Sequence, residues 1–137
     1  MSAEPDCLFC KIVAGEIPAT IVAQDERTIA FMDINPATRG HALVIPRAHA
    51  RDVHEIDPED LKAVVASAQQ IAARARSKLA ADGVNLMNSN GSAAWQTVFH
   101  FHLHVIPRYR DDPLRLPWVP GPGDADEIAA AGAALRA

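Results

Sequence analysis

The chain has 137 residues, of which 49% are hydrophobic and 22% charged, and its formal net charge is −4. This length allows one domain with a real core and argues against two. Because the chain is acidic overall, it lacks the basic surface of a polynucleotide-binding protein, although a single nucleotide needs only a local site. The sequence opens with no charged-then-apolar leader and has no apolar run as long as a membrane span, so we expect a cytoplasmic protein with no membrane partner.

Three short strands and one long helix are expected in the first part of the chain. The strands cover residues 20–24, 27–32 and 42–45. From Pro58 to about Ala81 the apolar residues recur at helical spacing. Asp57 is the expected N-cap, with Pro58 in the first helical position and Gly83 just past the end. This is the main helix of an α+β fold.

Two further strands and a tail are expected in the remainder. The strands, over residues 84–87 and 98–106, are separated by the loop NSNGSAAWQ, whose Asn, Ser and Gly residues favour turns. Prolines keep PLRLPWVPGPG extended, and Asp124 and Glu127 resemble a capping box at the start of a short helix. We interpret residues 1–137 as one domain, with its core at about 7–108 and a tail over 109–137.

The stretch HFHLHVI, residues 100–106, alternates histidine with apolar residues. On a strand, His100, His102 and His104 would share one face, and the residues between them would face the core. The outer two Cα atoms would lie roughly 13 Å apart, so one zinc ion cannot readily bind all three imidazoles. At least one histidine is left to act as a nucleophile, a base or a phosphate-binding donor near neutral pH.

This stretch matches the His-φ-His-φ-His-φ-φ motif of the histidine triad (HIT) superfamily, and three blocks resemble the small prokaryotic members of its Hint branch. The blocks are CLFCKIVAGEIPA, AFMDINPATRGHALVIPRAH and NSNGSAAWQTVFHFHLHVIPR. They follow one another from about Cys7 to Arg108, which makes the resemblance specific. It implies a HIT-like fold: an antiparallel sheet of about five strands with one main helix and a short C-terminal helix.

The resemblance implies hydrolysis or transfer at the α-phosphate of purine nucleoside phosphoramidates or related nucleotides, through a covalent nucleotidyl-histidine intermediate. His102 would attack the α-phosphorus. The donors to the phosphate oxygens would be His104, Asn88, Gln96 and Thr97. His41 matches an additional histidine of the family, which lies near the nucleophile and helps to set its tautomer.

The ribose and the base are also assigned by the resemblance. Asp33 would accept hydrogen bonds from both ribose hydroxyls. The slot for the base would consist of Phe9, Ile12, Phe31 and Ile34. Such a slot grips the faces of a purine and distinguishes its edge poorly, so adenosine and guanosine compounds are both expected as ligands. Judged without the resemblance, Asp33 is equally a turn residue, and core packing is the better interpretation of the apolar residues.

Cys7 and Cys10 have the two-residue gap of a zinc half-site. The resemblance implies that His49 and His100 supply the other half, which would leave His102 free. A closed site with four protein ligands would be structural, because it has no open position for a reacting water. A pair of reduced cysteines without metal is the alternative, since such pairs occur in the cytosol.

Some properties of the chain allow more than one interpretation. Trp95 stands where the family usually has a small residue, often glycine, and this leaves the leaving group open. Trp118 in the tail is expected near the active site, where it would influence the choice of leaving group.

Hint relatives pair through the main helix and a strand, so the resemblance implies a homodimer. The alternatives are a non-catalytic nucleotide-binding, zinc-stabilised interaction module and a hydrolase with a catalytic zinc on HFHLH.

Overall fold

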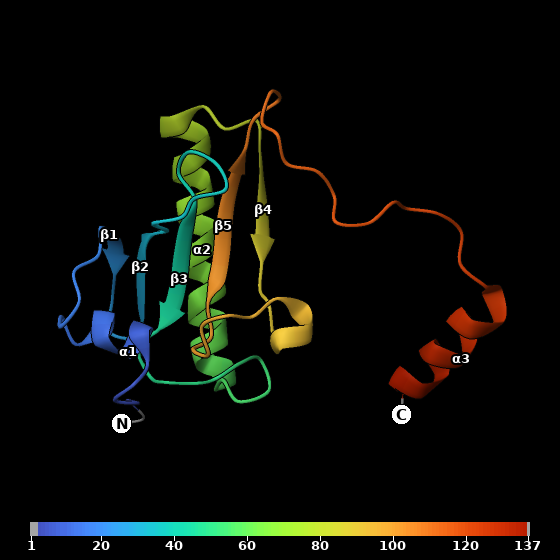
Figure 1. Ribbon diagram of the computed structural model, residues 1–137, viewed down its shortest axis with the longest axis horizontal. Helices are drawn as coiled ribbons and strands as arrows, with labels where there is room; N and C mark the ends of the chain where they lie inside the picture. The colour runs from blue at the N-terminus through green and yellow to red at the C-terminus, as the bar shows by residue number, and fades with distance from the viewer. Residues whose placement is uncertain (1–2, 137) are drawn as a thin grey trace.

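The computed structural model describes residues 3–136, which are arranged around one sheet (Figure 1). The elements in chain order are α1 (Leu8–Val13), β1 (Ile21–Gln24), β2 (Thr28–Met32), β3 (Ala42–Pro46), α2 (Pro58–Leu79), β4 (Gly83–Met87), the 3-10 helix η1 (Ser92–Ala94), β5 (Leu103–Arg108) and α3 (Ala125–Arg136). The strands pair antiparallel in the order β1-β2-β3-β5-β4. The expected α+β fold with a five-stranded antiparallel sheet is confirmed.

Helix α2 lies along one face of the sheet and forms the larger hydrophobic core with it (Figure 1). Its buried residues Val64, Ala68 and Ile71 recur at spacings of four and three, which places them on one stripe. They pack against buried residues of the strands, Ala30, Ala42, Val44, Leu103 and Val105. Burying one Val or Ile side chain contributes about 1.5–3 kcal/mol, so this stripe fixes α2 on the sheet.

The start of α2 is as expected, whereas its end differs. The Asp57 carboxylate caps the helix by accepting from the Glu59 N–H at 2.7 Å. The helix ends at Leu79, and Ala80 adopts a left-handed conformation with φ 55°. Gly83, expected just past the helix, is the first residue of β4. The chain turns early because sheet pairing already begins at Asp82, whose N–H donates to the Arg108 carbonyl at 2.9 Å.

Strand β5 is shorter than the sequence predicts, because it begins at Leu103 and not at residue 98. The carbonyl of Pro46, at the end of β3, accepts a hydrogen bond from the imidazole of His100 at 2.8 Å. This side-chain bond takes the place of a backbone bond between the two strands. Upstream of β5, the Phe101 N–H donates to the carbonyl of Ala50. Phe101 still packs in the core under α2, so the predicted alternation of faces holds from that residue onward.

Helix α1 was not predicted, since six residues are too few to reveal a helical period. It covers the other face of the sheet. Its residues Phe9 and Ile12 pack against the buried strand residues Ile29, Phe31, Leu43 and Ile45. The Cys10 N–H donates to Sγ of Cys7, which caps the helix at its N-terminus. The N-terminal segment therefore forms one wall of the molecule.

The tail beyond Tyr109 leaves the sheet as an extended arm and ends in α3 (Figure 1). Asp124 caps α3 as expected, because its carboxylate accepts from the Glu127 N–H at 2.9 Å. No side chain of α3 is buried. Among residues 3–136, no helix has both the length and the apolar character needed to cross a bilayer.

Candidate functional site

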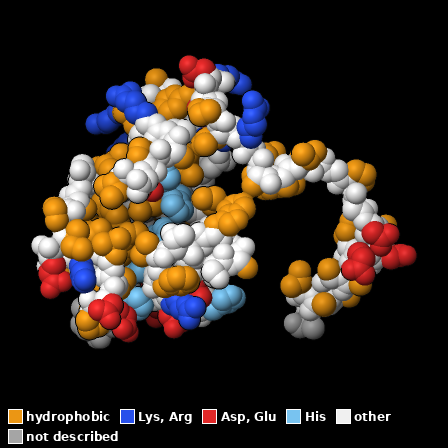
Figure 2. Space-filling view, viewed as in Figure 1, with side chains coloured by type: hydrophobic (Ala, Val, Ile, Leu, Met, Phe, Trp, Pro, Cys, Tyr) orange, Lys and Arg blue, Asp and Glu red, His pale blue; other side chains and the backbone are white. Residues whose placement is uncertain are grey.

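A cavity of about 360 Å³ lies between α1 and the open face of the sheet, which is a size typical of small-molecule sites. Figure 2 shows pale-blue histidine atoms in the middle of this side of the molecule, beside a hydrophobic patch. Eight predicted site residues line the cavity: Phe9, Ile12, Phe31, Asp33, Ile34, Thr97, His102 and His104. Ile34 is 90% exposed and thus forms only the rim.

The buried imidazole of His102 is held in one tautomer. Its Nδ1–H donates to the carbonyl oxygen of His100 at 2.7 Å, so Nε2 carries the lone pair. Burial lowers the pKa of His102. The ring also packs edge-on against Phe9, with 5.1 Å between centroids. At neutral pH this side chain is therefore an uncharged imidazole with a free nucleophilic nitrogen at the cavity.

His104 and His41 contact each other next to His102. Nε2 of His41 lies 2.9 Å from Nδ1 of His104. The ring of His104 lies 5.0 Å from that of His102, between centroids. Burial, with the neighbouring histidines, lowers the pKa of His104 to about 4. Burial also lowers the pKa of His41, against an opposing effect of Asp33.

His41 lies near His102, as the resemblance implied, but it does not contact the nitrogen that sets the tautomer of His102. The carbonyl of His100 sets the tautomer of His102, whereas His41 contacts His104 and Asp33. Asp33 accepts from the Asn35 N–H through Oδ1 at 2.8 Å, and its Oδ2 lies 3.5 Å from Nε2 of His41. The Asp33 carboxylate therefore has both a turn role and a place at the cavity, so the two interpretations of this residue are compatible.

Two of the predicted phosphate donors are occupied by bonds to the backbone. The Gln96 amide group donates to the carbonyl oxygens of Arg51 at 2.7 Å and Val98 at 3.2 Å. Its side-chain oxygen accepts from the Gly91 N–H at 2.7 Å. Asn88 donates to the carbonyl of His102 at 2.9 Å. In this structure Gln96 and Asn88 thus hold the loop and the backbone of His102, and of the predicted loop donors Thr97 alone lines the cavity.

Sequence reasoning did not assign several other residues around the cavity. They are Leu8, Ile17, Pro18, Ala19, Met32, Asn35, Leu43 and Val98. All eight lie within the three blocks of the resemblance, which was the available signal for them. Seven are apolar and one is an asparagine, and their side-chain type alone does not distinguish them from core or loop residues.

Four predicted metal ligands converge behind the cavity, with all four ligand atoms within 4.8 Å of one another: Cys7, Cys10, His49 and His100. Sγ of Cys10 lies 3.4 Å from Nδ1 of His49 and 3.5 Å from Nδ1 of His100. Sγ of Cys7 lies 3.4 Å from the same atom of His100. Tetrahedral zinc with ordinary bond lengths places sulfur and nitrogen ligands roughly 3.6 Å apart, so the spacing fits.

The tautomer of His100 also fits a metal ion. Its Nε2–H donates to the Pro46 carbonyl, so the lone pair is on Nδ1, the nitrogen that faces the two sulfur atoms. Burial lowers the pKa of His100 to about 4, which keeps the ring neutral. Burial raises the pKa of the Cys10 thiol, and a bound cation would oppose this effect. The donor set is that of a closed zinc site.

The HIT domain family model matches residues 14–111. The chain therefore belongs to the HIT family. "Protein hit" of Bacillus subtilis is 44% identical over 109 residues, which are 80% of this chain and 75% of that protein. The adenosine 5'-monophosphoramidase hnt1 of Schizosaccharomyces pombe is 35% identical over 127 residues, 92% of each chain.

A solved structure adds the metal to this comparison. The Zn-bound histidine triad family protein from Mycobacterium smegmatis is 43% identical, with a TM-score of 0.78 and 96% of each chain covered. Within the family, this chain is a nucleotide-binding, hydrolase-like protein with a cluster suited to zinc.

Proposed function

We propose that this protein hydrolyses, or transfers the nucleotidyl group of, purine nucleoside phosphoramidates through a covalent intermediate on His102. One observation carries the proposal: His102 is neutral and fixed in one tautomer, with the lone pair of Nε2 free at a nucleotide-sized cavity. The similarity to an adenosine 5'-monophosphoramidase supports the same chemistry. Related phosphoanhydrides are within the proposed range, because attack at the α-phosphorus is the common step.

The proposed reaction has two displacements at phosphorus. In the first, Nε2 of His102 forms a bond to the α-phosphorus, and the bond to the leaving amine breaks as the amine takes up a proton from solvent water; the water that attacks in the second step returns a proton to the solvent. The modified ring keeps its Nδ1–H, whose bond to the His100 carbonyl stabilises the positive charge. In the second, water attacks phosphorus, the nitrogen–phosphorus bond breaks and the nucleoside monophosphate leaves. His104 and Thr97 donate to the non-bridging oxygens in both steps.

The rest of the cavity provides the nucleotide specificity in this proposal. Asp33 accepts from the ribose hydroxyls, and Phe9, Ile12, Phe31 and Ile34 surround the base. The edge-on ring pair of Phe9 and Phe31, 5.4 Å apart between centroids, offers an apolar contact to either purine. We therefore propose adenosine and guanosine compounds as ligands, and no polynucleotide.

We propose that the Cys7, Cys10, His49 and His100 cluster holds a structural zinc ion. When bound, zinc would link the N-terminal segment to the chain around the nucleophile and stabilise both cysteine thiolates. All four positions are taken by protein atoms, so the ion has no open position for a reacting water. Cysteine thiolates need a reducing compartment, which favours the cytoplasm as the place of action.

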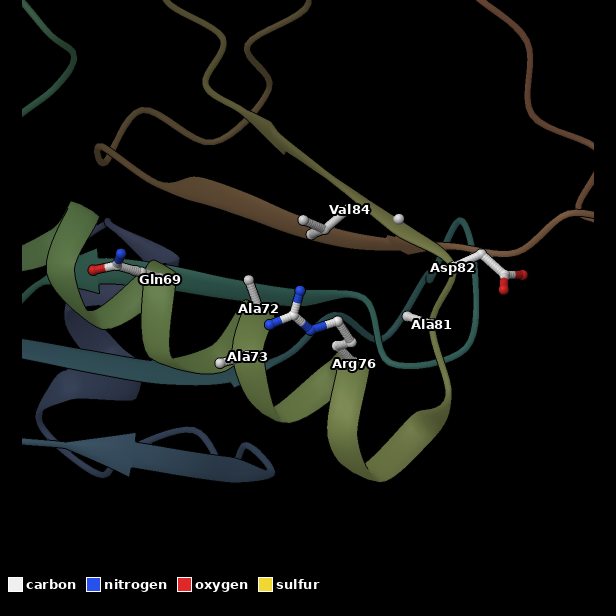
Figure 3. A pocket seen from close by; sticks show the side chains of 8 residues that line it. Gln69, Ala72, Ala73, Arg76, Ala81, Asp82 and Val84 are labelled. Atoms are coloured by element: carbon white, nitrogen blue, oxygen red, sulfur yellow. The ribbon is translucent and has the colours of Figure 1, made fainter.

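We also propose a homodimer that pairs through α2 and β4. β4 is an edge strand whose residues are all exposed, Val84 and Leu86 among them. A groove of about 360 Å³ runs between α2 and β4, with Ala72, Arg76 and Val84 on its sides (Figure 3). An unpaired edge beside an apolar groove favours pairing with a second copy of the chain. Trp118 on the exposed arm would then reach the partner's site.

The test is steady-state hydrolysis of an adenosine phosphoramidate by the wild type, His102→Ala and His54→Ala. His54 is an exposed histidine outside the cavity and serves as the matched control. We expect His102→Ala to lose at least about 10³-fold in rate, and the control to lose almost nothing. A wild type that binds adenosine monophosphate tightly without turnover would support the non-catalytic binding module instead.

A further inference from the structure

One backbone amide orders the protons of the histidines beside the nucleophile. We infer that the N–H of Ala37 is a positioning group, which keeps His104 protonated on Nε2 and so makes it an N–H donor towards the cavity. This inference rests on the proposed function for its catalytic consequence, but the order of the protons follows from the geometry alone.

The order begins in the loop between β2 and β3. The Ala37 N–H donates to Nδ1 of His41 at 2.9 Å. A backbone amide is always a donor, so Nδ1 of His41 is the acceptor and its Nε2 must carry the proton in the neutral ring. That Nε2 lies 2.9 Å from Nδ1 of His104, which is consequently an acceptor. The proton of neutral His104 is therefore on Nε2.

Asp33 agrees with this assignment. Its Oδ2 lies 3.5 Å from Nε2 of His41, so the same N–H faces two acceptors, the carboxylate and the ring of His104. Burial keeps both histidines neutral near pH 7, because it lowers the pKa of His104 to about 4 and also lowers that of His41. Neither ring needs a second proton to satisfy these contacts.

The opposite placement of the protons on the two rings would be unfavourable for binding phosphate. With the proton on Nδ1 of His41, Nε2 would present a lone pair to the Asp33 carboxylate. His104 would then place its own proton on Nδ1, and its Nε2 lone pair would repel an anionic oxygen in the cavity. The Ala37 amide excludes this order, since the proton on Nδ1 of His41 would point at another N–H.

The hydrogen bond from the Ala37 N–H to His41 also explains why Asp33, His41 and His104 do not form a good metal site. Ligand atoms of Asp33, His41 and His104 lie within 4.8 Å of one another, which is close enough for one ion. A metal on Nε2 of His41 would require the ring's proton on Nδ1, against the Ala37 N–H. The group is therefore a hydrogen-bond relay from the carboxylate to His104.

The test replaces Ala37 by lactic acid, which substitutes an ester oxygen for the N–H and keeps the methyl group. The ring-nitrogen NMR spectrum of the full chain gives the tautomer of each histidine, independently of activity. We expect His104 to be Nε2–H in the wild type and a mixture of tautomers in Ala37→lactic acid. His102 should stay Nδ1–H in both, because the His100 carbonyl holds it. In the same variant kcat should fall about tenfold, with KM changed less than twofold.

Two controls isolate the lost N–H. Ala81→lactic acid removes an N–H that donates to the Ala75 carbonyl at the end of α2, and Ala37→Gly removes only an exposed methyl group. Both should keep the wild-type tautomers, and Ala81→lactic acid should also keep the wild-type kcat. A His104 that remains Nε2–H without the Ala37 amide would overturn the inference. A wild type without hydrolysis but with the expected tautomers would reject the proposed function alone.

Discussion

His100 makes contacts through two different groups, and these link the proposed metal ligands to the proposed nucleophile within one residue. Its imidazole faces the sulfur atoms of Cys7 and Cys10, whereas its carbonyl oxygen accepts the Nδ1–H of His102. In the proposed function, the alternating motif thus combines a metal ligand, a nucleophile and a phosphate donor at every second position. The distance argument from the sequence, that one zinc cannot take all three imidazoles, agrees with this division.

The pH dependence of kcat/KM should reflect buried, neutral histidines. Protonation of His102 removes its nucleophilic lone pair, and burial lowers its pKa below 6.5. Protonation of His104 would occur only near pH 4. The neutral, active forms therefore persist below pH 6.5, and we expect the plateau of kcat/KM to extend to lower pH than an unperturbed histidine would allow. In rapid assays, a fall of kcat/KM on the acid side with its midpoint at or above pH 6.5 would contradict the assignment of neutral, buried histidines.

At the scale of elements, α1 connects the metal cluster with the base slot. Cys7 and Cys10 flank Phe9, which packs against Phe31 on one side and His102 on the other. A helix of only six residues has little stability of its own, so its place depends on tertiary contacts. A bound metal ion would supply two of the strongest of these contacts, through Cys7 and Cys10.

Removal of the metal should consequently weaken both the fold and nucleotide binding. With a strong chelator we expect Tm to fall by more than about 5 °C, because binding to the folded state alone contributes free energy of folding. The Kd for adenosine monophosphate should rise severalfold by calorimetry, since α1 is released from the slot.

The double substitution Cys7→Ser, Cys10→Ser should match the chelated wild type and be insensitive to the chelator. Unchanged Tm and Kd in both experiments would favour the metal-free cysteine pair. Loss of the chemical step with unchanged binding would instead favour a catalytic zinc.

The elements differ in how far their sequences predict them. The helix α2 was predictable from its apolar period and its cap, and the strands β1 to β4 from short runs of strand-forming residues bounded by turns. β5 was predicted too long, since the apolar alternation continues through Phe101 although the backbone has left the sheet there. The contact between His41 and His104 links residues 63 positions apart and depends on the register of β3 and β5, which no local pattern specifies. Gln96 shows the same limit, because its partners are backbone atoms.

At the scale of the whole molecule, two surfaces with apolar side chains stay uncovered in the single chain. One is the groove beside β4 (Figure 3), and the other is the arm with its exposed large side chains, Leu116, Trp118, Val119, Ile128 and Leu135. The helix α3 at the end of this arm is capped, but none of its side chains is buried, so it gains little stability from the single chain. Both surfaces would be covered in the proposed homodimer.

Leu86→Asp should therefore convert a dimer into a monomer. The new carboxylate would be placed at the centre of the proposed interface, where an unpaired buried charge costs several kcal/mol. Sedimentation velocity of the wild type, Leu86→Asp and Val22→Asp measures this directly. Val22 is an exposed residue on β1, the opposite edge of the sheet, and its substitution should leave the dimer intact. A monomeric wild type, or a dimeric Leu86→Asp, would exclude pairing through β4.

The central claim is that His102 carries the nucleotidyl group, and intact-mass spectrometry of rapidly quenched protein tests it most directly. After mixing with an adenosine phosphoramidate, the wild type and His54→Ala should gain the mass of one nucleotidyl group within the first turnover, and His102→Ala should not. An adduct of the same mass on His102→Ala, or brisk hydrolysis by the wild type with no adduct at any quench time, would contradict the account.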